Sequence, residues 1–224
     1  MTTVRIVVPD TGPLITLAKL DLLDTLLAFK EDVRIVLTDY VEFEATRRRN
    51  DFPDAMAIHR FIVENFGRIE IEKTGLGTNY KKLFMLKERL AADPELSSQL
   101  GIDPGPPDDP GEMTIVQYVR DLIGHPPGIP VLILAEDDYF LRELSPLPGN
   151  AHVVSTRAFL NAFPRIAKLK DKPALWDAVA RFRDGSSNAA SVDRRAAKID
   201  TTWEDAVAPG AASGIIRAAR RRRL

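Results

Sequence analysis

The residues of this sequence with the clearest capacity for chemistry are four acidic side chains that lie far apart along the chain. They are Asp10, Glu44, Glu112 and Asp137. Asp10 closely follows the apolar run 4–8, and Asp137 follows the apolar run 131–134; both runs are typical of buried parallel strands. Open α/β sheets bind ligands at the carboxyl ends of their strands. We therefore expect these two carboxylates at that edge of a sheet.

A shared site for the four acids requires a positive partner, because carboxylates gathered at one place repel one another. Mg²⁺ and Mn²⁺ are hard cations that prefer oxygen ligands. An ion of this kind lowers the pKa of a coordinated water and holds it in line with a phosphate. The acids therefore predict a metal-dependent phosphodiesterase. Its candidate metal ligands are Asp10, Glu112, Asp137 and Asp138; one of the last two is expected to be a helix cap instead.

Each acid also has a purely structural explanation. Asp10 opens an Asp-Thr-Gly-Pro turn, in which its side chain can bond to the backbone. Glu44 and Glu112 fall near the starts of expected helices, where negative charge complements the helix dipole. Spacing distinguishes Glu44 from Glu42. If Val41 faces the core, Glu44 lies beside that face, whereas Glu42 points about 100° away from Val41, toward solvent.

Candidate substrate-binding residues accompany the acids. The hydroxyl of Thr11 is placed to orient the Asp10 carboxylate or a metal-bound water, and a local helix cap is the alternative. Arg142 follows Asp138 by one helical turn, at a distance suited to a phosphate or to a carboxylate partner. Arg47 and Arg48 follow Glu44 and are candidates for phosphate contacts, with a solvated helix face as the alternative. Five arginines near the C-terminus, at 217 and 220–223, are further candidates because flexible cations release counterions from phosphate.

The elements that must position these residues follow from hydrophobic periodicity. Strands are expected at residues 4–8, 33–37, 69–72, 130–134 and 152–154. Helices are expected at residues 14–27, 40–49, 51–66, 80–92, 112–123, 137–144 and 156–163. Residues 101–110 hold four prolines and two glycines and are expected to be irregular. The alternation predicts a three-layer α/β/α sandwich around a mostly parallel five-stranded sheet.

The composition narrows the class of protein. A length of 224 residues fits one domain at 1–165 and an extension at 166–224, with a helix at 175–182 and then an irregular basic tail. The net charge is −1, so any attraction to nucleic acid must be local. The absence of cysteine excludes disulfides, zinc–thiolate sites and cysteine nucleophiles. No apolar stretch has the length of a membrane span and no signal-peptide pattern is seen, so a cytoplasmic protein is expected.

In this order, the acidic segments resemble the PIN-domain family of nucleases, which includes the VapC-type toxins of bacterial toxin–antitoxin pairs. The resemblance covers residues 4–164 and rests on the segments VVPDTGPLITLAKL, VEFEAT, DPGEMTI, LILAEDDYFLR and VVSTRAFLNAF. It implies a five-stranded parallel sheet and cleavage of single-stranded RNA with one or two Mg²⁺ or Mn²⁺ ions. The family's acids correspond to Asp10, Glu44, Glu112 and Asp137, and its small hydroxyl to Thr11. An antitoxin partner and a homodimer are further implications.

The chain departs from compact members of that family in two places. Residues 75–109 exceed a minimal linker, and the C-terminal extension has no counterpart in the simplest members.

The main alternative function is a catalytically silent PIN-fold module that binds RNA or a partner, which the complete acidic set disfavours. A receiver-like signalling domain requires an acid doublet after the first strand, where this chain has only Asp10. A phosphatase that uses Asp10 as its nucleophile requires a second acid two residues later, and this chain has Gly12 there.

Overall fold

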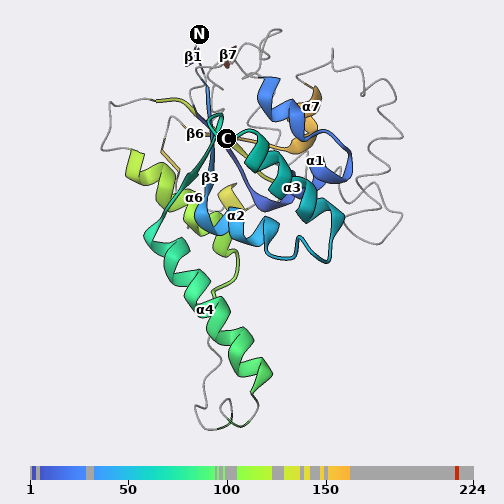
Figure 1. Ribbon diagram of the computed structural model, residues 1–224. Coiled ribbons are helices and arrows are strands. Elements are labelled where there is room, and N and C mark those ends of the chain that lie inside the picture. Colours follow the sequence, from blue (N-terminus) through green and yellow to red (C-terminus); the bar gives the residue numbers. More distant parts are fainter. Residues whose placement is uncertain are drawn as a thin grey trace.

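The computed structural model describes residues 2–3, 6–28, 33–93, 95, 98, 105–122, 129–136, 139–141, 147–148, 151–161 and 215–216. Its main feature is a sheet of five parallel strands between layers of helices (Figure 1). The strands are β2 (Ile6–Pro9), β3 (Arg34–Thr38), β4 (Ile69–Glu72), β5 (Val131–Leu134) and β6 (Ala151–Val154). Their order in the sheet is β4-β3-β2-β5-β6. The predicted three-layer α/β/α sandwich with five strands is confirmed, and the sheet is parallel throughout.

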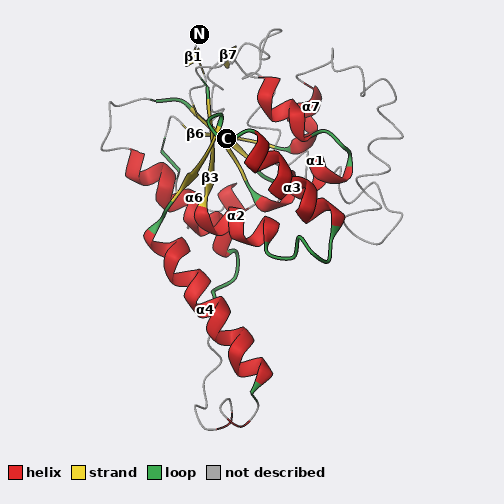
Figure 2. Cartoon of the chain, viewed as in Figure 1, coloured by secondary structure: helices red, strands yellow, loops and turns green. Residues whose placement is uncertain are grey.

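The α-helices whose bounds are described are α1 (Thr11–Lys19), α2 (Asp39–Thr46), α3 (Pro53–Glu64), α4 (Gly75–Ala92), α6 (Pro110–Asp121) and α7 (Thr156–Asn161). Figure 2 shows most of them gathered around the sheet, while α4 extends away from the body of the molecule. Every described helix is too short or too polar to span a lipid bilayer.

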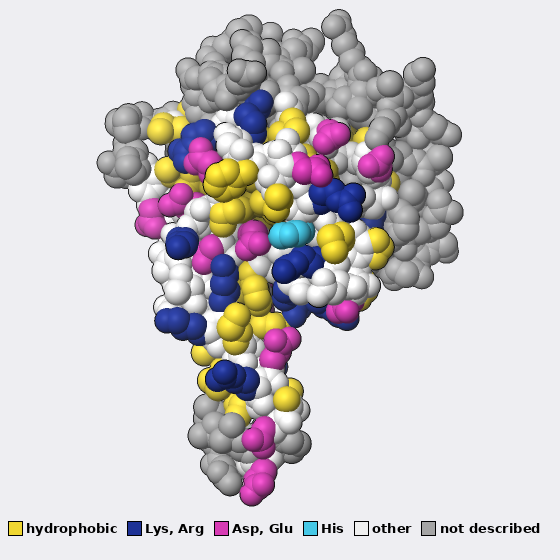
Figure 3. Space-filling model, viewed as in Figure 1, with side chains coloured by type: hydrophobic (Ala, Val, Ile, Leu, Met, Phe, Trp, Pro, Cys, Tyr) yellow, Lys and Arg dark blue, Asp and Glu magenta, His cyan; other side chains and the backbone are white. Residues whose placement is uncertain are grey.

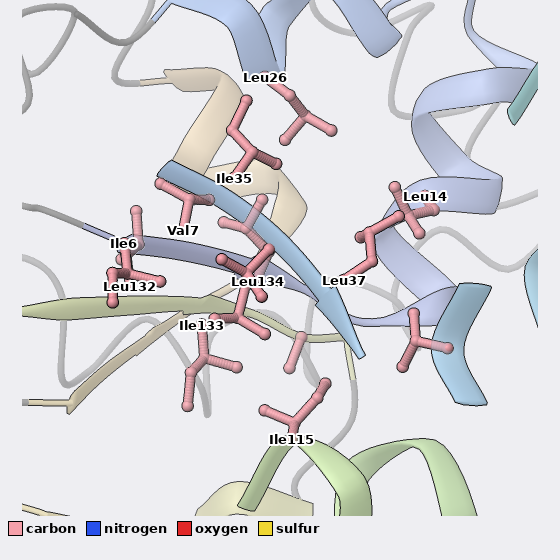
Figure 4. Packing of buried hydrophobic residues seen from close by; sticks show 14 of the residues in the cluster. Ile6, Val7, Leu14, Leu26, Ile35, Leu37, Ile115, Leu132, Ile133 and Leu134 are labelled. Carbon is pink, nitrogen blue, oxygen red and sulfur yellow. The ribbon is translucent and has the colours of Figure 1, made fainter. Parts of the chain in front are cut away.

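The core explains why the strands read as continuous apolar runs. All four residues of β2 and of β5 are buried, because helices cover both faces of the sheet. Figure 4 shows Leu14 of α1 and Leu26 approaching from one side and Ile115 of α6 from the other. The apolar spacing of residues 51–66 predicts Met56, Ile58, Phe61 and Ile62 as core positions of α3. Ile58, Phe61 and Ile62 are buried, whereas Met56 is 36% exposed and the prediction for it is wrong.

The prediction of a single helix at residues 14–27 is wrong, because two separate helical segments occupy these residues. Helix α1 ends at Lys19, and the 3-10 helix η1 runs from Leu23 to Ala28. Between them Asp21 has a φ of 55°, a left-handed conformation that Asp tolerates better than most residues. The leucines of both segments are buried against the same core, so the apolar spacing continues across the break.

Helix α4 begins five residues before the expected position 80. Thr74 caps its first turn, since Gly77 N donates to Thr74 Oγ1 at 2.9 Å. The carboxylate of Asp39, at the start of α2, accepts hydrogen bonds from Thr74 N (3.0 Å) and Thr74 Oγ1 (3.1 Å). Its other oxygen lies 3.3 Å from Lys81 Nζ. These contacts anchor the base of α4 on α2.

Several predicted segments lie mainly outside the described residues. Of the helix expected at 137–144, only the 3-10 turn η3 (Tyr139–Leu141) is described. The helix expected at 175–182 is not among the described residues. Of the expected basic tail, only β7 (Ile215–Ile216) is described, and it pairs antiparallel with β1 (Thr2–Thr3).

Candidate functional site

The first acid of the set lies at the carboxyl edge of the sheet. Asp10 directly follows β2, and its backbone N donates to Leu134 O, at the end of β5, at 2.9 Å. The residue is only 4% exposed. Its side chain makes no capping hydrogen bond to α1, although it occupies the N-cap position. The Asp10 carboxylate therefore does not cap α1.

The second acid, Glu44, contacts Thr11, the residue next to Asp10, from a different part of the chain. Glu44 lies on α2, where the buried Val41 and Ala45 mark the core-facing side. Thr11 Oγ1 donates to Glu44 Oε2 at 2.6 Å, across 33 residues of sequence. The Thr11 hydroxyl thus holds a carboxylate from another element. The face that helical spacing assigned to Glu44 is the one that meets the start of α1.

The two carboxylates converge on the amino-terminal end of α6. A β-carbon added to Gly111 would lie 3.3 Å from Glu44 Oε2 and 3.4 Å from Asp10 Oδ1. Glycine at this position lets the helix backbone approach both oxygens closely. The partial positive charge of a helix N-terminus favours nearby anions. Three segments that are distant in the sequence therefore bring two acidic oxygens to one point.

A pair of buried hydroxyls fixes α6 in that place. Thr38, the last residue of β3, and Thr114 of α6 are hydrogen-bonded through their Oγ1 atoms at 2.7 Å. The 2.6 Å bond from Thr114 Oγ1 to Gly111 O ties the same hydroxyl to the first turn of α6. Both threonines are fully buried, so the position of Gly111 relative to the sheet is held by a water-excluded contact.

A third carboxylate, which the sequence argument did not select, lies beside the start of α1. Glu136 follows β5 closely and is 7% exposed. It accepts hydrogen bonds from Thr16 Oγ1 at 3.1 Å and from Thr156 Oγ1 at 2.6 Å. Its Oε2 would lie 3.4 Å from a β-carbon on Gly12. Its signal in the sequence was its position as the first acid after the fourth predicted strand, where Asp137 and Asp138 were preferred.

The remaining candidates are placed as follows. Glu112 is half-buried and directly follows Gly111. Asp137, Asp138 and Arg142 lie outside the described residues. Arg47 and Arg48 are exposed just past the end of α2.

Both arginines lie against aromatic rings. The guanidinium carbon of Arg47 is 4.2 Å from the ring centre of Phe84, and that of Arg48 is 4.2 Å from the ring centre of Phe52. Such cation–π contacts orient a guanidinium. Each arginine also lies near an acid: Arg47 is 3.9 Å from Glu88 and Arg48 is 3.5 Å from Asp51.

The charge of Glu44 also acts on its own helix. Burial, followed by the nearby negative charge of Glu44, raises the pKa of Tyr40 to about 12, and Arg47 opposes this shift. Tyr40 is therefore neutral across the physiological range. It is not a general base for this site.

The oxygen donors fit a hard divalent cation in type, since carboxylates are the ligands that Mg²⁺ and Mn²⁺ prefer. Within the described part of the chain, however, no three or more His, Asp or Glu residues form a group that could hold a metal ion. Asp10 and Glu44 supply two carboxylates at one point. Glu112 is described and does not complete a group of three with them. A full ligand set therefore requires an acid outside the described residues, for which Asp137 and Asp138 are the candidates.

Comparison of the chain with protein-family models, with characterised proteins and with solved structures gives no match.

Proposed function

We propose that this protein is a Mg²⁺- or Mn²⁺-dependent endoribonuclease that hydrolyses phosphodiester bonds of single-stranded RNA. The observation that carries the proposal is the convergence of Asp10 Oδ1 and Glu44 Oε2 on Gly111 at the carboxyl edge of a parallel sheet. Ligands of α/β sheets bind at this edge. The PIN-like order of acidic segments supports RNA as the substrate.

Each residue has a distinct role in this proposal. Asp10 would bind the metal ion together with Glu112 and one of Asp137 and Asp138. When bound, the ion supplies an activated water and neutralises charge on the phosphate. Glu44 would orient waters around the ion, and Thr11 holds its carboxylate through the 2.6 Å hydrogen bond. Asp10 is buried, so water screens its interactions only weakly.

The test is RNA cleavage by the purified full-length chain with Mg²⁺, with Mn²⁺, or with a chelator. We expect the wild-type protein to cut a mixed single-stranded RNA pool only with metal. Asp10→Asn and Glu44→Gln should lower the rate at least about 100-fold, the usual effect of removing a charge-stabilising group. Asp121→Asn is the matched control, because Asp121 is exposed at the far end of α6.

Cleavage that persists in chelator, or that is equal in wild type and both acid variants, would remove the nuclease proposal. RNA that is bound but never cut under any metal condition would support the silent binding module instead. A toxin role makes a further demand: a small partner protein should abolish the cleavage by filling the acidic site.

A further inference from the structure

A groove on the outer side of α2 lies one helical turn from the acidic site. It has a volume of about 450 Å³ and runs between the end of α2 and the middle of α4. Its lining residues are Phe43, Arg47, Arg48, Asp51, Phe84, Met85 and Glu88. Figure 3 shows basic and apolar side chains alternating along the α4 arm in this view. The lining thus combines aromatic rings with guanidinium groups.

Four aromatic rings connect the core to this groove. The Tyr40 ring centre lies 5.9 Å from that of Tyr80 and 5.8 Å from that of Phe43, and Phe43 lies 5.4 Å from Phe84. The two tyrosines are buried and join α2 to α4. The two phenylalanines are half-buried at the groove. The inner rings therefore fix the geometry, and the outer rings keep aromatic surface accessible.

Positive charge is concentrated around the same groove. Residues 47–52 and 75–92 contain seven Lys or Arg and two Asp or Glu, a net charge of +5 in a chain whose total is −1. Local charge of this sign attracts polyanions even when the total charge does not. Within the lining, Arg47 lies 3.9 Å from Glu88 and Arg48 lies 3.5 Å from Asp51, so these four charges balance. The excess positive charge is carried by the residues that flank the groove, where it complements a phosphate backbone.

The groove and the acidic site occupy neighbouring faces of α2. Phe43 and Glu44 are consecutive, so their side chains point about 100° apart around the helix. Arg47 follows Glu44 by one turn, a separation of about 5 Å along the axis. The groove therefore begins about one helical turn from Glu44.

We propose that the α2–α4 groove binds the nucleotides next to the scissile phosphate, with unpaired bases stacking on Phe84 and Phe43 and phosphates contacting Arg47 and Arg48. The inference rests on the proposed RNA substrate. Stacking on aromatic rings in a positive groove is the general means by which proteins hold single strands without sequence preference. It requires unpaired bases, so the groove selects single-stranded over double-stranded RNA.

The experiment is fluorescence anisotropy of a short labelled single-stranded RNA of mixed sequence, titrated with full-length protein in chelator so that binding is separated from cleavage. Phe84→Leu keeps apolar volume and removes the stacking surface, and its Kd should rise roughly tenfold. Phe66→Leu is the matched control, since Phe66 is 85% exposed and lies outside the groove. Its Kd should equal that of the wild type.

A second pair of variants tests the charge. Arg47→Gln should flatten the dependence of log Kd on log salt by about 0.7, the slope for one contact to a single-stranded phosphate. Arg120→Gln, at the exposed end of α6, should leave the slope unchanged. Asp10→Asn should bind RNA as tightly as wild type while its cleavage is lost.

The outcomes separate this inference from the proposed function. If the wild type cleaves RNA and both groove variants bind RNA as tightly as the wild type, the inference is overturned and the proposed function is not. The groove would then be a site for a protein partner. Equal affinity for double-stranded and single-stranded RNA also overturns it. A wild-type protein that neither binds nor cuts RNA overturns both proposals.

Discussion

The point at which Asp10 and Glu44 meet shows how single side chains set the character of this protein. Two carboxylates that approach the same glycine repel each other, and the burial of Asp10 weakens the screening by water. Thr11 offsets part of this cost by donating a short hydrogen bond to Glu44. The remaining repulsion is expected to lower the stability of the fold when no cation is bound.

We therefore expect Asp10→Asn to stabilise the protein when no divalent ion is bound. The free energy of unfolding in chelator should rise by roughly 0.5–2 kcal/mol, because one of two repelling charges is removed. Urea denaturation measures the change, and Asp121→Asn serves again as the exposed control. A loss of stability in Asp10→Asn would mean that its carboxylate contributes mainly structural contacts.

Individual elements depend on a small number of buried polar connections. Asp39 joins the start of α2 to the first turns of α4 through Thr74 and Lys81. Glu136 joins the end of β5 to α1 through Thr16 and to α7 through Thr156. Buried carboxylates in such positions are costly unless they are paired and hydrogen-bonded. Both acids are, and each holds elements that frame the candidate site.

Two glycines of α4 separate the effect of the Asp39 contact from helix propensity. A β-carbon on Gly77 would lie 2.1 Å from Asp39 Oδ1, whereas one on Gly75 would meet only Gln117 Nε2, at 3.5 Å. Gly77→Ala should therefore lower the free energy of unfolding by roughly 1–3 kcal/mol. Gly75→Ala should be neutral or stabilising by up to about 1 kcal/mol. Urea denaturation of both variants checks the difference, and equal effects would contradict the close contact at Gly77.

On the scale of the whole molecule, charge is separated although the total is nearly zero. The carboxylates gather at the sheet edge, and residues 47–52 and 75–92 beside it carry a net charge of +5. Figure 1 shows α4 projecting from the α/β body. The interior, in contrast, carries tyrosines that must remain neutral.

The raised pKa values of two of these tyrosines make the stability of the fold depend on pH. Burial is the main cause that raises the pKa of Tyr40, and that of Tyr118, to about 12, from an ordinary value of 10.0. Above pH 10 the unfolded chain loses these protons first, so the contribution is complete below about pH 10 and is lost as the pH rises through about 12. The free energy of unfolding should fall across this window.

Denaturation at about pH 9 and about pH 11 measures this fall. Tyr40→Phe combined with Tyr118→Phe should show a smaller fall than the wild type, because two of the ionising groups are gone. An equal fall in both proteins would assign the pH dependence to other groups.

Much of the fold is contained in local patterns. The apolar runs located all five strands of the sheet, and helical spacing distinguished Glu44 from Glu42, because periodicity reports which side of an element is buried. Periodicity does not report a break whose flanking segments share one core, so Asp21 and the end of α1 were missed. Nor does it report which distant segments touch.

Strand endings alone were enough to place Asp10 at the carboxyl edge of a parallel sheet. The packing of α6 against β3 was needed to bring Gly111 between Asp10 and Glu44, and the packing of α4 on α2 was needed to form the groove. The burial of Glu136 likewise depends on α1 and α7 meeting at the end of β5. These contacts join residues many positions apart, and their geometry is set by the fit of whole surfaces.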